Sequence, residues 1–200
     1  MPDYKIGYFV GSLASGSINR ILSKALIRLA PAGLEFTEIP IKDLPLYSPD
    51  FDSDYPAEGK ALKDAIEASD GILFVSPEYN RSIPGALKNA IDWGSRPWGT
   101  NSFARKPTGI VGASPGGIGT AVMQSSMRSV LSFLDAPQLN SPEAYIRFDP
   151  SVFGDDGTVS DADTEAFLRH YMEEYGAFVT RVLAANAPGH IGDESANSHK

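Results

Sequence analysis

The sequence predicts an α/β fold, in which a doubly wound, five-stranded parallel sheet lies between two layers of helices. Strand-like and helix-like patterns alternate along the chain, and this alternation is typical of βαβ units and a parallel sheet. In addition, Gly71–Val75 is short and wholly apolar, as expected of a central parallel strand that is buried on both faces. Together these observations favour a three-layer α/β/α architecture.

The five expected strands are apolar or alternating runs bounded by glycine, proline or small polar residues. They are Lys5–Val10, Leu34–Ile39, Gly71–Val75, Thr108–Val111 and a fifth strand within Gln138–Ile146. Gly11 and Ser12 end the first strand, and Pro40 closes the second. Pro142 leaves the limits of the fifth strand open, because proline cannot donate to the hydrogen-bond ladder of a sheet.

Apolar residues at helical spacing mark the helices between these strands. The expected helices are Ile18–Leu29, about Gly59 to Ala68, Pro84 to about Trp93, Gly119–Leu134 and a final helix through Phe167–Val182. Pro31 and Gly33 end the first helix, whereas Pro84 suits the start of the third because the first turn does not need its missing N–H. The stretch Lys42–Glu58 is rich in Pro, Asp and Ser, so we expect it to be a loop.

Length and composition predict one domain over residues 1–187, followed by a flexible tail over residues 188–200. No apolar run approaches the roughly 20 residues needed to cross a bilayer. The segment after Met1 also lacks the basic, apolar and small-residue order of a signal peptide. We therefore expect a cytoplasmic protein without a membrane partner.

Several kinds of chemistry are excluded by composition. The chain has no cysteine, which removes disulfides, thiolate catalysis and cysteine-ligated metals. Its three histidines have no metal-ligand spacing, so no metal site is expected. The net charge of −8 argues against a nucleic-acid partner, although much of that charge lies within Phe148–Leu168. We interpret this stretch as a solvated acidic loop, because its spacing does not match an EF-hand.

Three loops rich in small, polar or glycine residues follow the first, third and fourth strands, namely Gly11–Asn19, Ser76–Ile83 and Gly112–Gly119. Alternating strands and helices allow several topologies, of which the flavodoxin-like strand order 2-1-3-4-5 is one. In that order, ligands bind beyond the carboxyl ends of the strands, near the switch point between strands 1 and 3. All three loops would then meet at one ligand site.

The first of these loops has the composition of a phosphate site. A helix N-terminus presents unpaired backbone N–H groups and a positive dipole end. Additional side-chain donors are Ser12, Ser15, Ser17 and Asn19. The loop is not a Walker P-loop, and the spacing of Gly11 and Gly16 does not fit a dinucleotide fingerprint. The same residues would also suit an ordinary helix start with Ser17 as N-cap and no ligand.

The loop after the third strand carries a family resemblance. From Ser76 to Trp93 the sequence is SPEYNRSIPGALKNAIDW, which resembles the signature of the NADPH-dependent FMN reductase family. That family includes bacterial quinone, chromate and azo-dye reductases. The resemblance extends to the Gly-Ser…Ser-x-Asn pattern of the first loop and to Gly112–Gly117, so it covers roughly Lys5 to Leu134.

This resemblance implies a domain that binds flavin mononucleotide (FMN), with the loop Pro77–Asn80 along the flavin ring. Ser114–Gly117 would approach the other edge of the ring, where glycines permit close backbone contact, and the Ser/Asn-rich loop would bind the phosphate. The implied cofactor-binding residues are Ser12, Ser17, Ile18, Asn19, Pro77, Glu78, Tyr79, Asn80, Ser114, Gly116 and Gly117.

The implied activity is ping-pong hydride transfer from NADPH or NADH to FMN, and then to a quinone, azo compound or metal oxyanion. Because the hydride passes directly to the cofactor, no side chain is expected to be catalytic. Glu78 is interpreted as a positioning or subunit-contact residue rather than as a general acid or base. A homodimer or homotetramer is also implied.

Ala14 departs from the family pattern, since many members have an arginine there that pairs with the FMN phosphate. The absence of that arginine removes a charge-assisted contact of about 1.5–3 kcal/mol. Arg20 is near in sequence, but it lies one turn into the expected helix, where its side chain can point elsewhere.

Two alternatives remain open. Gly112–Gly116 fits the G-x-S-x-G elbow of serine hydrolases, with Ser114 as nucleophile and His170 downstream. Pro115 argues against this function, because the residue after the nucleophile must supply a backbone N–H to the oxyanion hole. The other alternative is a non-catalytic electron carrier or flavin-binding regulator of the flavodoxin type. Such proteins usually sandwich the flavin between aromatic residues, whereas the ring loops here offer only Tyr79.

Overall fold

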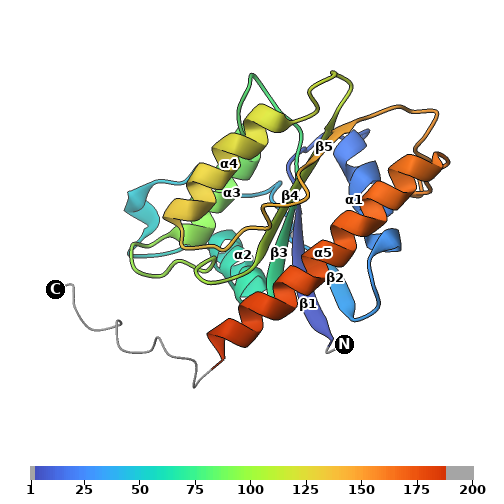
Figure 1. Ribbon diagram of the computed structural model, residues 1–200. Helices are drawn as coiled ribbons and strands as arrows, with labels where there is room; N and C mark the ends of the chain where they lie inside the picture. The colour runs from blue at the N-terminus through green and yellow to red at the C-terminus, as the bar shows by residue number, and fades with distance from the viewer. Residues whose placement is uncertain (1–2, 188–200) are drawn as a thin grey trace.

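A computed structural model describes residues 3–187 as a five-stranded parallel sheet covered by helices on both faces (Figure 1). The strands lie in the order β2-β1-β3-β4-β5, which confirms the expected 2-1-3-4-5 topology. Their bounds are β1 (Tyr4–Val10), β2 (Leu34–Glu38), β3 (Gly71–Val75), β4 (Thr108–Ser114) and β5 (Ala144–Arg147). The flexible tail predicted at residues 188–200 lies outside the described residues.

The helices form the two outer layers of the molecule. They are α1 (Ile18–Leu29), α2 (Ala57–Glu67), α3 (Gly85–Ser95), α4 (Ala121–Phe133) and α5 (Ala162–Asn186), with a short 3-10 helix at Pro49–Phe51. In Figure 1, α1 and the long α5 lie on one side of the sheet, and α2, α3 and α4 lie on the other. This arrangement is the doubly wound architecture that the alternating pattern predicts.

The core is divided by the sheet into two parts. Every residue of β3 is buried, and its side chains alternate between the faces. Phe74 packs under α2, α3 and α4, where its ring stacks on Phe9 with centroids 5.2 Å apart. Leu73 and Val75 pack instead against the side covered by α1 and α5. Burial on both faces explains why this strand carries no polar residue.

The expected end of the fourth strand at Val111 is wrong, because β4 continues to Ser114. Gly112 and Ala113 have little intrinsic strand preference, but β5 pairs with them and continues to Arg147, beyond the predicted limit of Ile146. The Phe148 N–H donates to the Ser114 carbonyl at 2.9 Å and extends this pairing. Ser114 therefore ends a strand rather than lying inside a loop.

Helix boundaries also shift, by less than one turn in the first four helices, whereas the final helix extends beyond the expected Phe167–Val182 to Ala162–Asn186. The second helix begins at Ala57, inside the stretch expected to be a loop, and the third continues to Ser95. The fourth begins at Ala121 rather than at Gly119. Gly119 has φ of +58°, and a Cβ there would lie 2.8 Å from the carbonyl carbon of Tyr145. The close approach to β5 thus requires glycine and a non-helical backbone at this position.

Within residues 3–187, no helix has the length and apolar character that a membrane span requires. The same residues contain no cluster of His, Asp and Glu side chains that could hold a metal ion.

Candidate functional site

A cavity of about 230 Å³ lies at the carboxyl edge of the sheet, where the loops after β1, β3 and β4 meet. Its lining consists of Ser12, Gly16, Ser17, Ile18, Asn19, Pro77, Glu78, Tyr79, Ala113, Ser114 and Pro115. Eight of the eleven predicted cofactor-binding residues are in this set. The three loops converge because β1 and β3 are neighbours while their helices lie on opposite faces of the sheet, which is the switch point of this topology.

Asn80, Gly116 and Gly117 lie outside the lining, on exposed parts of the loops after β3 and β4. Three other residues line the cavity without having been predicted, namely Gly16, Ala113 and Pro115. Gly16 and Pro115 lie within the loops that the sequence singled out, whereas Ala113 belongs to β4 and has no functional group that could have marked it.

The N-terminus of α1 faces this cavity with an unpaired hydroxyl. Ser17 is the N-cap residue, but its side chain makes no capping bond to the helix. The side chain is buried, with the residue 6% exposed, and its Oγ has no hydrogen-bond partner within the described residues. Buried polar atoms are nearly always paired, and helix N-termini bind anions. This end of α1 is therefore suited to a phosphate.

The side chain of Asn19 serves to fix the loop. Its Nδ2 donates to the Ala113 carbonyl at 3.0 Å, and its Oδ1 accepts from the Ala113 N–H at 2.8 Å. Both polar ends are thereby used inside the protein, and the residue is almost completely buried. Asn19 therefore connects the first turn of α1 to β4 through its side chain. Its backbone N–H is one of the first-turn amides that have no acceptor within the helix.

Ser12 and Tyr79 join the first and third strand loops at the cavity. The two hydroxyl oxygens are 3.3 Å apart, and Ser12 Oγ also accepts from the Ala14 N–H at 3.3 Å. Tyr79 is the single aromatic residue of the lining and is half exposed. The cavity thus has one aromatic wall and does not enclose a planar ligand between two rings.

Glu78 caps a helix that lies far from it in sequence. Its Oε2 accepts from the backbone N–H groups of Val122 at 3.1 Å and Met123 at 3.0 Å, in the first turn of α4. The N-cap residue of α4, Thr120, makes no side-chain capping bond of its own. A carboxylate at this position also compensates the helix dipole. Glu78 therefore fixes the loop after β3 to α4, which is a positioning role.

The tight turn at Asn80 and Arg81 ends this loop. The two residues have φ of +51° and +61°, and the turn is closed by hydrogen bonds of 3.1 and 3.0 Å between Tyr79 and Ser82. Left-handed backbone is tolerated by asparagine and uncommon for arginine. The turn directs both side chains away from the core, which explains why Asn80 does not line the cavity.

Arg20 points away from the cavity. Its guanidinium makes two hydrogen bonds to the carboxylate of Glu38, at 2.7 and 2.9 Å, at the end of β2. The hydrogen bond with Glu38 raises the pKa of Arg20 above its already high ordinary value. Ala14 is exposed, and neither lysine nor arginine belongs to the described lining. A phosphate bound here would be held by hydroxyls and backbone amides.

Comparison with known proteins identifies this arrangement. The family model described as NADPH-dependent FMN reductase matches residues 4–150. The chain belongs to this family. It is accordingly an FMN-dependent oxidoreductase that uses NAD(P)H, and the Pro77–Tyr79 part of the Ser76–Trp93 signature lines the cavity of this FMN reductase family member.

Relatives of this family member include a 2-hydroxy-1,4-benzoquinone reductase of Burkholderia sp, which is 47% identical over 175 residues covering 88% of this chain and 96% of that protein. A quinone reductase of Pseudomonas putida is 44% identical over 177 residues, covering 88% and 95% of the two chains. Among solved structures, FerB, a flavoenzyme NAD(P)H:(acceptor) oxidoreductase of Paracoccus denitrificans, aligns with a TM-score of 0.86 and 40% identity. That alignment covers 89% of this chain and 98% of FerB.

The residues of the cavity fit FMN. The buried Ser17 hydroxyl and the first-turn amides of α1 suit its phosphate. The half-exposed Tyr79 and the exposed glycines Gly116 and Gly117 leave room for a flat ring, since a Cβ at Gly117 would meet no atom within 4 Å. The donor set of this FMN reductase is thus neutral and consists largely of backbone and hydroxyl groups.

The hydrolase alternative receives no support from the surroundings of Ser114. Its Oγ accepts from the Gly116 N–H at 3.1 Å, and α4 begins only at Ala121, so the strand does not turn directly into a helix as in a nucleophile elbow. His170 is exposed on α5, and no hydrogen bond joins it to Ser114 within residues 3–187.

Proposed function

We propose that this FMN reductase uses NAD(P)H to reduce quinones. The main support for this proposal is the cavity at the switch point. There the buried Ser17 hydroxyl, which has no partner within the described residues, lies with the N-terminus of α1 and the loop Pro77–Tyr79. Two relatives with 47% and 44% identity bear the names of quinone reductases, which supports this acceptor class. When bound, FMN supplies the ring that accepts hydride and passes it on.

The side chains of the site would bind and orient the cofactor rather than exchange protons. Ser12, Ser17 and the backbone amides of Ile18 and Asn19 would hold the phosphate at the N-terminus of α1. The loop Pro77–Asn80 would lie along the ring, fixed by the bonds from α4 to Glu78. Ser114, Gly116 and Gly117 would approach the other edge. Because only Tyr79 supplies an aromatic wall, one ring face stays open for the nicotinamide and then for the quinone.

The test is the absorption spectrum of the FMN-loaded protein during anaerobic titration with NADPH and with NADH, followed by addition of a benzoquinone. We expect NAD(P)H to bleach the visible absorption bands of the flavin rapidly, and we expect these bands to return when the quinone is added. A spectrum that neither coenzyme changes would overturn the reductase function. Parallel assays with an azo dye and with chromate rank the acceptors, and a higher kcat/KM for either than for benzoquinone would contradict the quinone assignment.

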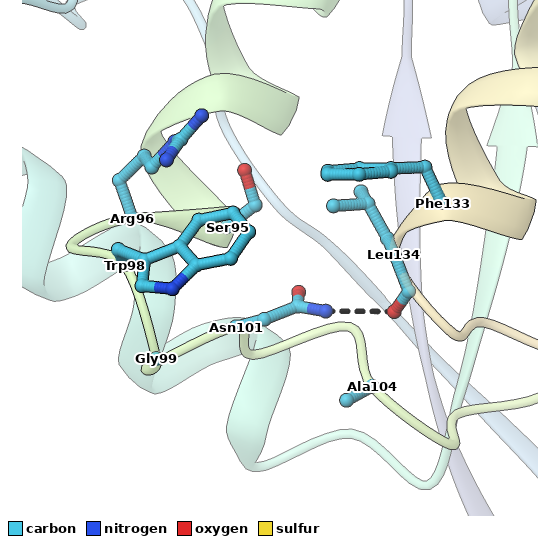
Figure 2. Close-up of a pocket in the computed structure, with 8 residues that line it drawn as sticks. All are labelled: Ser95, Arg96, Trp98, Gly99, Asn101, Ala104, Phe133 and Leu134. Carbon is cyan, nitrogen blue, oxygen red and sulfur yellow. Dashed lines mark hydrogen bonds between the residues drawn. The ribbon is translucent and has the colours of Figure 1, made fainter. Parts of the chain in front are cut away.

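We propose further that the enzyme works in the cytoplasm, where metabolism supplies NAD(P)H, as a homodimer or homotetramer. Support for self-association comes from a second cavity of about 390 Å³ at the opposite edge of the sheet, between the ends of α3 and α4. Figure 2 shows Trp98 and Phe133 converging on it above the hydrogen bond from Asn101 to the Leu134 carbonyl. These two aromatic residues are 74% and 72% exposed, and their ring centroids are 6.4 Å apart.

Exposed aromatic pairs of this kind are common at subunit contacts. Light scattering after size-exclusion chromatography should therefore give twice or four times the mass of 21.4 kDa. Phe133→Ser should weaken that association. A monomeric wild-type protein at micromolar concentration would contradict this part of the proposal.

A further inference from the structure

Arg81 is a cation close to the cavity that is not among the predicted cofactor-binding residues. Neither lysine nor arginine lines the described cavity, and Arg20 is held by Glu38. Arg81 lies two residues beyond Tyr79, on the turn that projects from the lining loop. Its guanidinium lies 3.8 Å from the carboxylate of Glu78, which belongs to the lining, so the charge is beside the cavity but outside its described lining.

The backbone holds Arg81 at this place in an unfavourable conformation. Its φ of +61° is left-handed, and the adjacent Asn80 is also left-handed. Two hydrogen bonds between Tyr79 and Ser82 enforce the turn. Glycine or asparagine would occupy such a position with less strain, and strained residues tend to occur at ligand-binding loops. The turn fixes where the long side chain starts, so less flexibility is lost when it binds a ligand.

The guanidinium of Arg81 is available to a ligand. The side chain is 67% exposed, and within residues 3–187 its one ion pair is with Glu78 Oε1 at a distance of 3.8 Å. The other carboxylate oxygen of Glu78 is occupied by the amides of α4. Glu78 thus anchors the loop but engages Arg81 only near the distance limit of an ion pair. The Glu78 side chain is 10% exposed, whereas the Arg81 end of the pair lies in solvent, where such a contact is weak.

We propose that Arg81 binds a phosphate group of the nicotinamide coenzyme. The proposal rests on the proposed function, because it presumes that NAD(P)H reaches the open side of this cavity. The chain has a net charge of −8, so an anionic coenzyme is attracted only where a local cation offsets that charge. The guanidinium matches phosphate oxygens with two parallel hydrogen bonds, which an ammonium group does not do. Arg81 is thus a specificity residue for the coenzyme and not a catalytic residue.

The coenzyme has two sources of phosphate, and the experiment separates them. Arg81→Gly removes the side chain and suits the left-handed backbone, so the loop should stay folded. For this variant we expect kcat/KM to fall about tenfold, the loss of one charge-assisted contact. If kcat/KM falls with NADPH but not with NADH, Arg81 binds the 2′-phosphate. If kcat/KM falls equally with both coenzymes, Arg81 binds the pyrophosphate. Arg81→Lys should recover only part of the loss in kcat/KM, because lysine keeps the charge but cannot make the two parallel hydrogen bonds of a guanidinium.

Arg181→Ala is the matched control, since it removes one positive charge from the surface of α5 near Phe178 and should change kcat/KM less than twofold. Calorimetric titration of the FMN-loaded protein with adenosine 2′,5′-bisphosphate and with ADP gives a readout independent of turnover. If Arg81→Gly leaves kcat/KM and both titrations within twofold of wild type, the proposal is wrong. Failure of the proposed function is distinguishable, because wild-type protein would then reduce no quinone while the titrations still report on Arg81.

Discussion

Helices α1 and α4 both begin at the carboxyl edge of the sheet, yet their N-termini differ in charge. At α4, the carboxylate of Glu78 accepts from two first-turn amides at 3.1 and 3.0 Å. At α1, no acidic residue lies in the first turn, and the Ser17 hydroxyl has no partner within the described residues. Both helices have the same dipole, but only α4 has it compensated by the protein. The open helix end is the one that faces the cavity.

A third helix supports the contrast. At the start of α5, Asp161 accepts from the Thr164 N–H at 2.8 Å, and hydrogen bonds to Thr164 lower the pKa of Asp161. Asp163 and Glu165 follow in the first turn. Acidic groups thus lie at the starts of α4 and α5, whereas α1 has none. The start of α3 also lacks an acidic group and a side-chain cap, but no residue of α3 lines the cavity. What distinguishes α1 is that its uncompensated N-terminus lies at the cavity, which is the arrangement that an anion site requires.

The largest effect is expected when α1 is made to resemble α4. Ser17→Asp places a carboxylate at the N-cap, beside the proposed phosphate position, where like charges in near contact repel by roughly 3–4 kcal/mol at an effective dielectric constant of about 20. FMN affinity should fall about 100-fold. The melting temperature of the FMN-free protein should rise, because aspartate is a good N-cap and compensates the dipole. Flavin fluorescence titration and thermal melting measure the two changes.

Ser15→Asp is the control for this variant, since it adds the same charge to an exposed residue of the same loop, outside the lining. Its effect on FMN affinity should be clearly smaller. If Ser17→Asp binds FMN as tightly as wild type, the N-terminus of α1 is not the phosphate site.

The next largest effect concerns α4. Glu78→Ala removes both capping bonds and leaves two amides of the first turn without their acceptor, so the free energy of unfolding should fall by about 2 kcal/mol. Glu78→Gln keeps an acceptor without the charge and should lose about half as much. Urea denaturation of the FMN-free protein measures both values. Glu173→Ala, which removes an exposed acidic residue of α5, should change stability by less than about 0.5 kcal/mol. Equal losses for Glu78 and Glu173 would show that the cap contributes nothing.

A smaller effect is expected from adding a cation to the loop that precedes α1. Ala14→Arg restores the residue that many family members have, and the exposed position gives its side chain room to turn toward the phosphate. FMN should bind about tenfold more tightly, the lower end of the range for a charge-assisted contact. Ala14→Gln is the matched control of similar length without charge. Unchanged or weaker affinity of Ala14→Arg would mean that hydroxyls and amides already coordinate the phosphate fully.

The strands, the helices and the three loops could be predicted from the sequence, because they are local patterns. The alternation allowed several sheet orders, of which 2-1-3-4-5 is the one that the structure has, and most of the cavity lining was implied by the family resemblance. A positioning or subunit-contact role was expected for Glu78, but the sequence did not predict the partners of Glu78 and Asn19. Glu78 caps a helix that begins more than 40 residues later, and Asn19 pairs with a backbone group of β4. Neither contact has a local sequence signal, since each depends on which strands become neighbours. Ser114 was placed in a loop because the strand preference of Gly112 and Ala113 is weak, and pairing with β5 overrides it.

The smallest effect concerns Arg20, which is near the N-terminus of α1 in sequence but bound to Glu38. Arg20→Gln should leave FMN affinity within twofold of wild type, because the guanidinium does not face the cavity. The side chains of this pair are 39% and 34% exposed, so the free energy of unfolding should fall by only about 0.5 kcal/mol. A tenfold loss of FMN affinity would instead mean that Arg20 leaves Glu38 for the phosphate. In that case Glu38→Gln, which releases Arg20, should tighten FMN binding. The feature that distinguishes α1 from α4 would then be the positive charge of Arg20 and not the uncompensated N-terminus of α1.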